Sequence, residues 1–205
     1  PIDDVTGTEY PEARFYIKSE IWDNLSKNFH EGYIIAWRSL TSATNRRTML
    51  ATLLPLIPTC QSIQILQLDN IDDMLQVLVL FNSIIFDYIV RLKMAGLDLT
   101  QTIIKQIPVP KKEIYESVIV FQDKEDTIRN HVYARIKYLY AKDKRVSALF
   151  ENNDICDSTK KSRKQIISEL DCLVGVMYGL STEQIKEIAS TFDKYYTKKE
   201  VEQWF

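Results

Sequence analysis

The sequence is poor in the residues from which metal and catalytic sites are most often built. Its 205 residues include three cysteines, two histidines and five glycines. The cysteines share no C-x-x-C spacing, and His30 and His131 are 101 residues apart, so no metal site is expected. The odd number of thiols and the lack of a secretory leader pattern favour a cytoplasmic location. Because the chain opens on Pro1, we expect it to be a fragment of a longer protein.

The sequence also lacks the short motifs that carry common enzyme chemistry. None of its glycines forms a G-x-G-x-x-G or phosphate-binding pattern, and no G-x-S-x-G elbow occurs. No acidic residue stands two positions before a lysine, which argues against a metal-dependent nuclease of the common type. No Pro-Pro pair is present to stack on a flipped adenine. We therefore expect no catalytic residue and no cofactor in this chain, while a dispersed triad stays open.

The distribution of charge is more informative than the net charge of −2. No acidic residue occurs between residues 32 and 68, whereas this stretch contains Arg38, Arg46 and Arg47. Residues 129–164 contain ten basic residues against four acidic ones. Such blocks fit either an ordinary solvated surface or a face that attracts a polyanion.

Hydrophobic patterning predicts strands in the first third of the chain and helices afterwards. Aromatic and β-branched residues are concentrated in four segments, 13–19, 32–40, 48–57 and 62–68. After residue 70 the spacing of apolar residues changes from that of strands to that of a helix, and one long, buried helix is predicted over 72–95. Its apolar character makes a central core helix the favoured interpretation.

A polar stripe runs along this predicted helix. Gln76, Ser83, Asp87 and Arg91 share one side at helical periodicity, and Asp87 is expected to pair with Arg91 one turn later. The plain interpretation is a solvent-facing or domain-facing edge. A membrane span is the alternative, and these polar residues disfavour it, so no membrane partner is expected.

The rest of the chain is predicted from its prolines, its helix-capping residues and its hydrophobic periodicity. Residues 99–110, LTQTIIKQIPVP, are predicted as a short strand that ends at two prolines. Everything that follows is predicted to be helical, with apolar faces within 125–142 and 158–180. Capping-box patterns at Ser181 and Thr197 open two short helices.

The predicted fold class is therefore α+β. Residues 1–112 are expected to form a β-rich part around the central helix 72–95. Residues 113–205 are expected to form a helical part, in which Gly179 suits a helix C-cap.

Two segments carry a resemblance to a known family. The first is YIIAWRSLTSATNRRTMLATLLP, residues 33–55, followed by LFNSIIFDYIVRLKMAGLDLTQTIIKQIPVP, residues 80–110. The second is ELDCLVGVMYGLSTEQIKEIASTF, residues 169–192. Together they resemble the specificity region of type IIG restriction–modification enzymes and of related adenine-N6 DNA methyltransferases. The positions that match the family pattern are Arg38, Thr44 to Thr48, Pro55, Asn82, Ser83, Pro108 to Pro110, Glu169 to Asp171, Tyr178 to Ser181 and Phe192.

The resemblance implies a target-recognition region without catalysis of its own. It places S-adenosylmethionine and the catalytic site in an upstream methyltransferase domain of the same polypeptide. The expected partners are double-stranded DNA and that upstream domain. One departure concerns Arg46, where the family often has an acidic residue, so the turn is more basic here. This leaves two roles open for the turn, contact with DNA or docking to the catalytic domain.

The candidate DNA contacts are hydroxyl, amide and cationic side chains. Amides can bond adenine, arginine and lysine can bond guanine or phosphate, and hydroxyls can bond either. The candidates are Arg38, Ser42, Thr44, Asn45, Arg46, Arg47, Gln101, Lys105, Lys142, Lys144 and Arg145. For Arg38 or Arg47 the alternative is an internal ion pair, or a cap on a helix of the missing upstream domain. For residues 100–106 it is plain sheet pairing, and for residues 142–145 a solvated face.

Three other functions stay open from the sequence. A type I specificity subunit is a close relative of the first hypothesis, but would predict two recognition lobes. A helical scaffold for protein partners is favoured if the basic residues are scattered over all faces. A nuclease with an unrecognised site is the last alternative.

Overall fold

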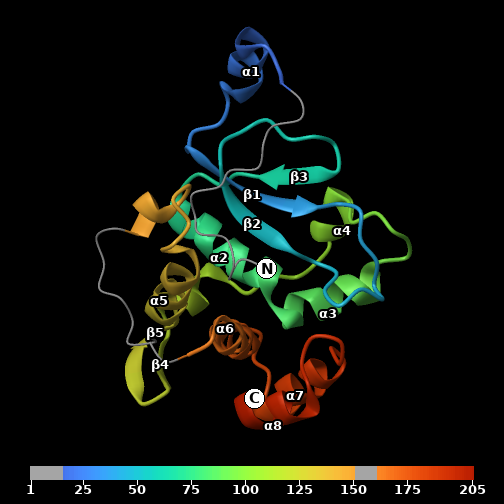
Figure 1. Ribbon diagram of the computed structural model, residues 1–205. Helices are drawn as coiled ribbons and strands as arrows, with labels where there is room; N and C mark the ends of the chain where they lie inside the picture. Colours follow the sequence, from blue (N-terminus) through green and yellow to red (C-terminus); the bar gives the residue numbers. More distant parts are fainter. Residues whose placement is uncertain (1–15, 151–160) are drawn as a thin grey trace.

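The computed structural model describes residues 16–150 and 161–205. Its N-terminal part contains a three-stranded antiparallel sheet with the strand order β2-β1-β3 (Figure 1). The strands are β1 Tyr33–Arg38, β2 Ala51–Pro55 and β3 Ile63–Leu66, and each lies inside a predicted strand segment, so these predictions are confirmed.

The strand predicted at 13–19 is wrong over its described part. Residues 16–18 are irregular, and Ser19 begins helix α1, Ser19–Ser26. Glu20 in the first turn of α1 favours a helix start at this point, because a carboxylate interacts well with the positive end of the helix dipole. Residues 13–15 lie outside the described part of the chain.

The central strand β1 is the most buried part of the sheet. Ile34, Ile35, Ala36 and Trp37 each expose 3% or less of their surface. Trp37 stands edge-on to Phe81, with 5.7 Å between the ring centroids. This contact fixes one face of the sheet on the helix that carries Phe81, as expected for a core tryptophan.

The helix predicted over 72–95 is interrupted at Ser83. Helix α2 covers Ile71–Asn82, helix α3 covers Ile84–Lys93, and the pair is bent by 66°. The Ser83 hydroxyl donates to the carbonyl of Leu80 at 2.9 Å and accepts the N–H of Phe86 at 3.1 Å. One serine thus closes the first helix and caps the second, which is why the apolar run bends without a proline or glycine.

The bend turns the polar stripe toward the interior. Gln76, Ser83 and Asp87 expose 7%, 1% and 0% of their surface, so the solvent-facing interpretation is wrong for these residues, and the domain-facing alternative stays open. The predicted pairing of Asp87 with Arg91 is confirmed, at 3.3 Å. In the described part of the chain no single helix is long and apolar enough to cross a membrane, and only α2 and α3 taken together across their bend reach that length and composition.

Residues 99–110 do not form the predicted strand. Gln101–Ile104 form one helical turn, α4, and the Thr100 hydroxyl accepts the N–H of Ile103 at its start. The first N–H groups of a helix have no partner within the helix, and the threonine hydroxyl accepts one of them. In a strand the same N–H would need a neighbouring strand as its acceptor. The cap therefore outweighs the β-propensity of the two isoleucines.

The described residues of the C-terminal part are helical apart from a hairpin, which was not predicted from the sequence. The hairpin strands, β4 Val118–Phe121 and β5 Lys124–Thr127, are joined by Gln122 and Asp123, both with positive φ, 53° and 62°. Neither turn residue is glycine, so the usual hairpin signal is absent from the sequence. The elements are η2 Lys112–Glu116, β4 Val118–Phe121, β5 Lys124–Thr127, α5 Ile128–Tyr140, η3 Ser147–Phe150, α6 Arg163–Met177, α7 Thr182–Ser190 and α8 Lys198–Trp204.

The predicted helix ends in this part are confirmed. Ser181 and Thr197 form complete capping boxes at the starts of α7 and α8, and Ser162 forms a third at α6. Gly179 adopts a φ of 72°, the left-handed conformation that follows many helices.

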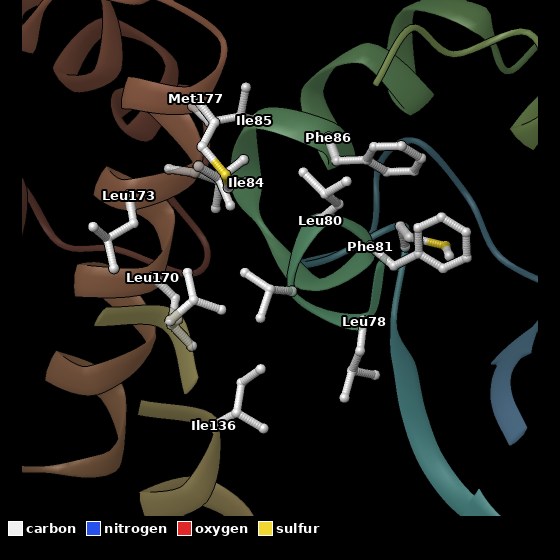
Figure 2. Close-up of a cluster of buried hydrophobic side chains, with 14 of the residues drawn as sticks. Leu78, Leu80, Phe81, Ile84, Ile85, Phe86, Ile136, Leu170, Leu173 and Met177 are labelled. Carbon is white, nitrogen blue, oxygen red and sulfur yellow. The ribbon is translucent and has the colours of Figure 1, made fainter. Parts of the chain in front are cut away.

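Both parts of the chain share one hydrophobic core. Leu78 and Ile84 of α2 and α3 belong to one cluster with Ile136 of α5 and Leu170 of α6. Phe81 points to the opposite side of α2, toward the sheet (Figure 2). The same cluster extends from Ile35 of the sheet to Val201 of α8. The fold is α+β with a helical C-terminal part, as predicted.

Candidate nucleic-acid interface

The loop between β1 and β2 contains five of the predicted DNA contacts, residues 42 and 44–47. Its hydroxyl groups bond back to its own backbone. Thr41 donates to the carbonyl of Thr48 at 2.9 Å, and Thr48 donates to the carbonyl of Ser42 at 3.0 Å. The Ser42 hydroxyl also accepts the N–H of Thr44 at 3.2 Å. These bonds close the loop, residues 39–48, into a compact turn.

Asp87 of α3 anchors the base of this loop. It accepts the side chain of Arg47 at 2.7 Å and the backbone N–H of Thr48 at 3.0 Å. Arg47 also donates to the carbonyl of Asn82 at 2.6 Å. Burial alone lowers the pKa of Arg47, but the charges of Asp87 and Asp171 outweigh burial and raise that pKa.

Arg47 is therefore not a DNA contact in this structure. Only 6% of its surface is exposed, and its guanidinium is committed to Asp87 and to a helix carbonyl. The alternative interpretation, an internal ion pair, is confirmed for Arg47. An arginine so placed sets the position of the loop instead of reaching a ligand.

Arg91 and Lys194 hold the loop backbone from two further sides. Arg91 donates to the carbonyls of Asn45 and Arg46, at 2.9 and 3.2 Å, and to the Thr48 hydroxyl at 3.1 Å. Lys194, in the turn between α7 and α8, donates to the carbonyl of Thr44 at 3.0 Å. Because the backbone carbonyls are bonded inward, the side chains at the tip are left on the surface.

The exposed tip consists of Thr44, Asn45 and Arg46. The Arg46 guanidinium lies over the ring of Tyr195, 5.0 Å from its centroid. The Asn45 amide makes a long bond to the Thr41 hydroxyl, at 3.3 Å. Arg46 and Asn45 thus have defined positions, and each carries more hydrogen-bond donors than these contacts use.

The neighbouring candidates lie on α4 and at the end of β1. Gln101 and Lys105 are exposed, and Gln101 donates to the side chain of Gln64 at 3.1 Å. The backbone of Leu99 donates to Ser39 at 2.7 Å, which places the start of α4 beside the start of the loop. Arg38 is also exposed, one residue before that contact. The predicted strand is absent, but the structure still brings its polar residues next to the loop.

The basic candidates after α5 are a separate group. Lys142 and Lys144 are exposed, whereas Arg145 forms an ion pair with Asp143. Several other cations of the basic block are paired as well: Arg135 and Lys161 with Glu169, and Lys164 with Glu200. Much of the predicted basic block therefore consists of internal ion pairs, which leaves Lys142 and Lys144 as its freest members among the candidates.

A second buried carboxylate lies close to the loop anchor. Asp171 accepts the N–H of Ile84 at 2.9 Å and the hydroxyl of Tyr196 at 2.7 Å. Complete burial raises the pKa of Asp171 to about 6, although the charge of Arg47 opposes this shift. Asp171 thus joins α6 and the C-terminal aromatic residues to the start of α3.

The residues that position the loop were not predicted from the sequence. Arg91, Asp171, Lys194 and Tyr195 were not singled out for this role. The one available signal was the spacing of Asp87 and Arg91, which predicted their pairing but not their contact with a loop some forty residues earlier.

Comparisons with known proteins give no family for the chain. No protein-family model, no curated protein and no solved structure matches it. In the described ranges, 16–150 and 161–205, no group of three or more histidine, cysteine or acidic side chains could hold a metal ion.

Proposed function

We propose that the chain is a sequence-specific DNA-recognition region of a larger restriction–modification protein. The single observation that carries the proposal is the exposed tip Thr44–Asn45–Arg46 on a backbone fixed by Asp87, Arg91 and Lys194. Recognition of base edges requires a few polar side chains held at fixed positions, and rigid supports do this better than free loops.

Arg46 and Asn45 make the base and phosphate contacts in this proposal. Arg46 bonds a guanine edge or a phosphate, and its stacking on Tyr195 limits the freedom that binding would cost. Asn45 bonds an adenine edge after it gives up its long bond to Thr41. Gln101 and Lys105, at the two ends of α4, extend the contact beside the start of the loop. Arg38 lies on the other face of the sheet from Gln64 and Gln101, so the proposal does not include it.

The proposal assigns no catalysis and no cofactor to this chain. S-adenosylmethionine and the flipped adenine would bind in an upstream methyltransferase domain. Because Arg47 is buried, the interface has fewer cationic contacts than predicted. We therefore expect the weak affinity of a single module, with a Kd for DNA on the order of micromolar.

A selection from a randomised duplex library tests the proposal. The chain is incubated with the library, and bound duplexes are sequenced over several rounds. We expect enrichment of a defined motif, and we expect Asn45→Ala to relax the enrichment at one or two positions while other positions keep theirs. Uniform retention of all sequences by the unmodified chain would contradict specific recognition.

A further inference from the structure

A cavity of about 270 Å³ lies where β2, α2, α5 and α6 meet. These elements surround the middle of the molecule, between the sheet and the C-terminal helices (Figure 1). The apolar wall is formed mainly by Leu78, Val79, Ile136, Leu139, Ile167 and Leu170. An apolar cavity of about 150 Å³ is enough to bind benzene, so a substituted ring of one cycle fits here.

One wall of the cavity is a single face of α6. Arg163, Ile167 and Asp171 follow one another at intervals of four residues, so they lie one above the other along the helix. The cavity therefore has a cationic end at Arg163, an apolar middle at Ile167 and an acidic end at Asp171. The two charged ends are about 12 Å apart along the helix axis.

Arg163 is the cation of this cavity whose charge is not compensated. It makes a bond to the carbonyl of Leu139 at 3.1 Å, and no carboxylate in the described part of the chain forms an ion pair with it. The other two cavity arginines each face an acid, Arg47 with Asp87 and Arg145 with Asp143. A guanidinium has five N–H donors in a fork that matches a carboxylate.

The acids of the cavity do not compete for this arginine. Asp143 is bound by Arg145, and Asp171 is bound by Tyr196 and by the backbone of Ile84. A carboxylate at Arg163 would be two helical turns from Asp171, so repulsion between the two acids is weak.

We propose that this cavity binds a small carboxylate with an aryl or branched-alkyl body. The carboxylate pairs with Arg163, and the apolar body lies between Ile167, Leu139 and Leu78. None of the tip residues lines the cavity, and the proposed carboxylate contact at Arg163 is separate from Arg47 and Tyr195, the two lining residues that also position the loop.

A titration of the full chain followed by NMR tests the site. The probes are benzoate, benzyl alcohol and acetate, which carry the ring with the charge, the ring alone and the charge alone. We expect benzoate to bind with a Kd on the order of 1 mM. Benzyl alcohol should bind about tenfold more weakly, because it lacks a charge-assisted bond, and acetate should not saturate.

Two variants assign the contacts. Arg163→Gln should weaken benzoate about tenfold and leave benzyl alcohol unchanged. Ile167→Trp should weaken both ring probes, because it fills the cavity. Lys164→Gln is the matched control, since it removes the neighbouring charge, which pairs with Glu200 outside the cavity. Equal affinity for benzoate and benzyl alcohol, benzoate binding unaffected by Arg163→Gln, or no saturable shift would each overturn the proposal.

Discussion

The Nε atom of Arg47 lies 2.7 Å from a carboxylate oxygen of Asp87, and the two side chains expose only 6% and 0% of their surface. This pair joins the loop after β1 to helix α3. The same carboxylate accepts Thr48 and lies 3.3 Å from Arg91, so one buried acid organises the base of the candidate interface.

Loss of this acid should be costly for stability. Asp87→Ala leaves two arginines without their buried partner, and we expect the free energy of unfolding to fall by about 3–5 kcal/mol. Urea denaturation measures this change. Glu116→Gln, which removes the largely exposed partner of Arg129, should change stability by less than about 1 kcal/mol. Similar effects of the two substitutions would show that Asp87 is not a structural anchor.

Asp171 should make the folded state less stable as the pH rises. Its pKa is raised to about 6 by burial, above the usual value of 3.8, so the folded state binds the proton more tightly than the unfolded state. Tighter proton binding by Asp171 stabilises the folded state fully below about pH 4, and this stabilisation is lost as the pH rises through 6. The total change is on the order of 3 kcal/mol.

Comparison with Asp171→Asn isolates this effect. The amide can still bond Ile84 and Tyr196 but does not titrate near neutrality. Measured by urea denaturation, the stability of the variant relative to the unmodified chain should rise between pH 4.5 and pH 7.5. A difference that stays constant over this range would mean that Asp171 does not titrate there.

His131 should have the opposite dependence on pH. It is 97% buried beside Phe121, and burial together with the charge of Arg135 lowers its pKa from 6.5. The unfolded chain therefore takes up the proton first, and the contribution of the neutral ring is lost as the pH falls below 6.5. His131→Phe should reduce the loss of stability between pH 7 and pH 5 in thermal unfolding. An unchanged pH profile would contradict a neutral buried imidazole.

Arg91 is a positioning residue for the proposed interface. Arg91→Lys keeps the charge beside Asp87 but replaces the guanidinium, which bonds Thr48 through Nε and both loop carbonyls through Nη2, by a single ammonium that cannot hold all these contacts at once, so DNA affinity should fall about tenfold. The slope of log affinity against log salt should not change, because Arg91 does not neutralise a phosphate. Fluorescence anisotropy across a salt series measures both quantities. A reduced slope would instead place Arg91 in contact with DNA.

The sequence predicts local structure well wherever local signals decide it. The three strands alternate or contain β-branched runs, and the helix ends at Gly179, Ser181 and Thr197 carry their own capping chemistry. The break at Ser83 is harder, because an apolar run continues on both sides and only the serine marks the bend. The hairpin at Gln122 and Asp123 lacks the glycine that usually marks such a turn.

Long-range pairing limited the prediction of the candidate site. The tip residues were proposed as DNA contacts from the acid-free stretch and from the family resemblance, but the burial of Arg47 depends on Asp87, which is 40 residues away in sequence. Likewise, Lys194 reaches the loop from 150 residues away. No periodicity within a window of one helix or strand contains these contacts, so an exposed and a buried arginine could not be told apart at positions 46 and 47.

The most direct test of the DNA proposal is the salt dependence of binding for Arg46→Gln. Affinity for duplex DNA is measured by anisotropy at several salt concentrations for the unmodified chain, for Arg46→Gln and for Lys27→Gln, which removes an exposed charge at the end of α1. We predict that Arg46→Gln lowers affinity and reduces the salt slope by about 1, whereas Lys27→Gln changes neither. Equal slopes for all three proteins, or no measurable affinity at low salt, would contradict the account.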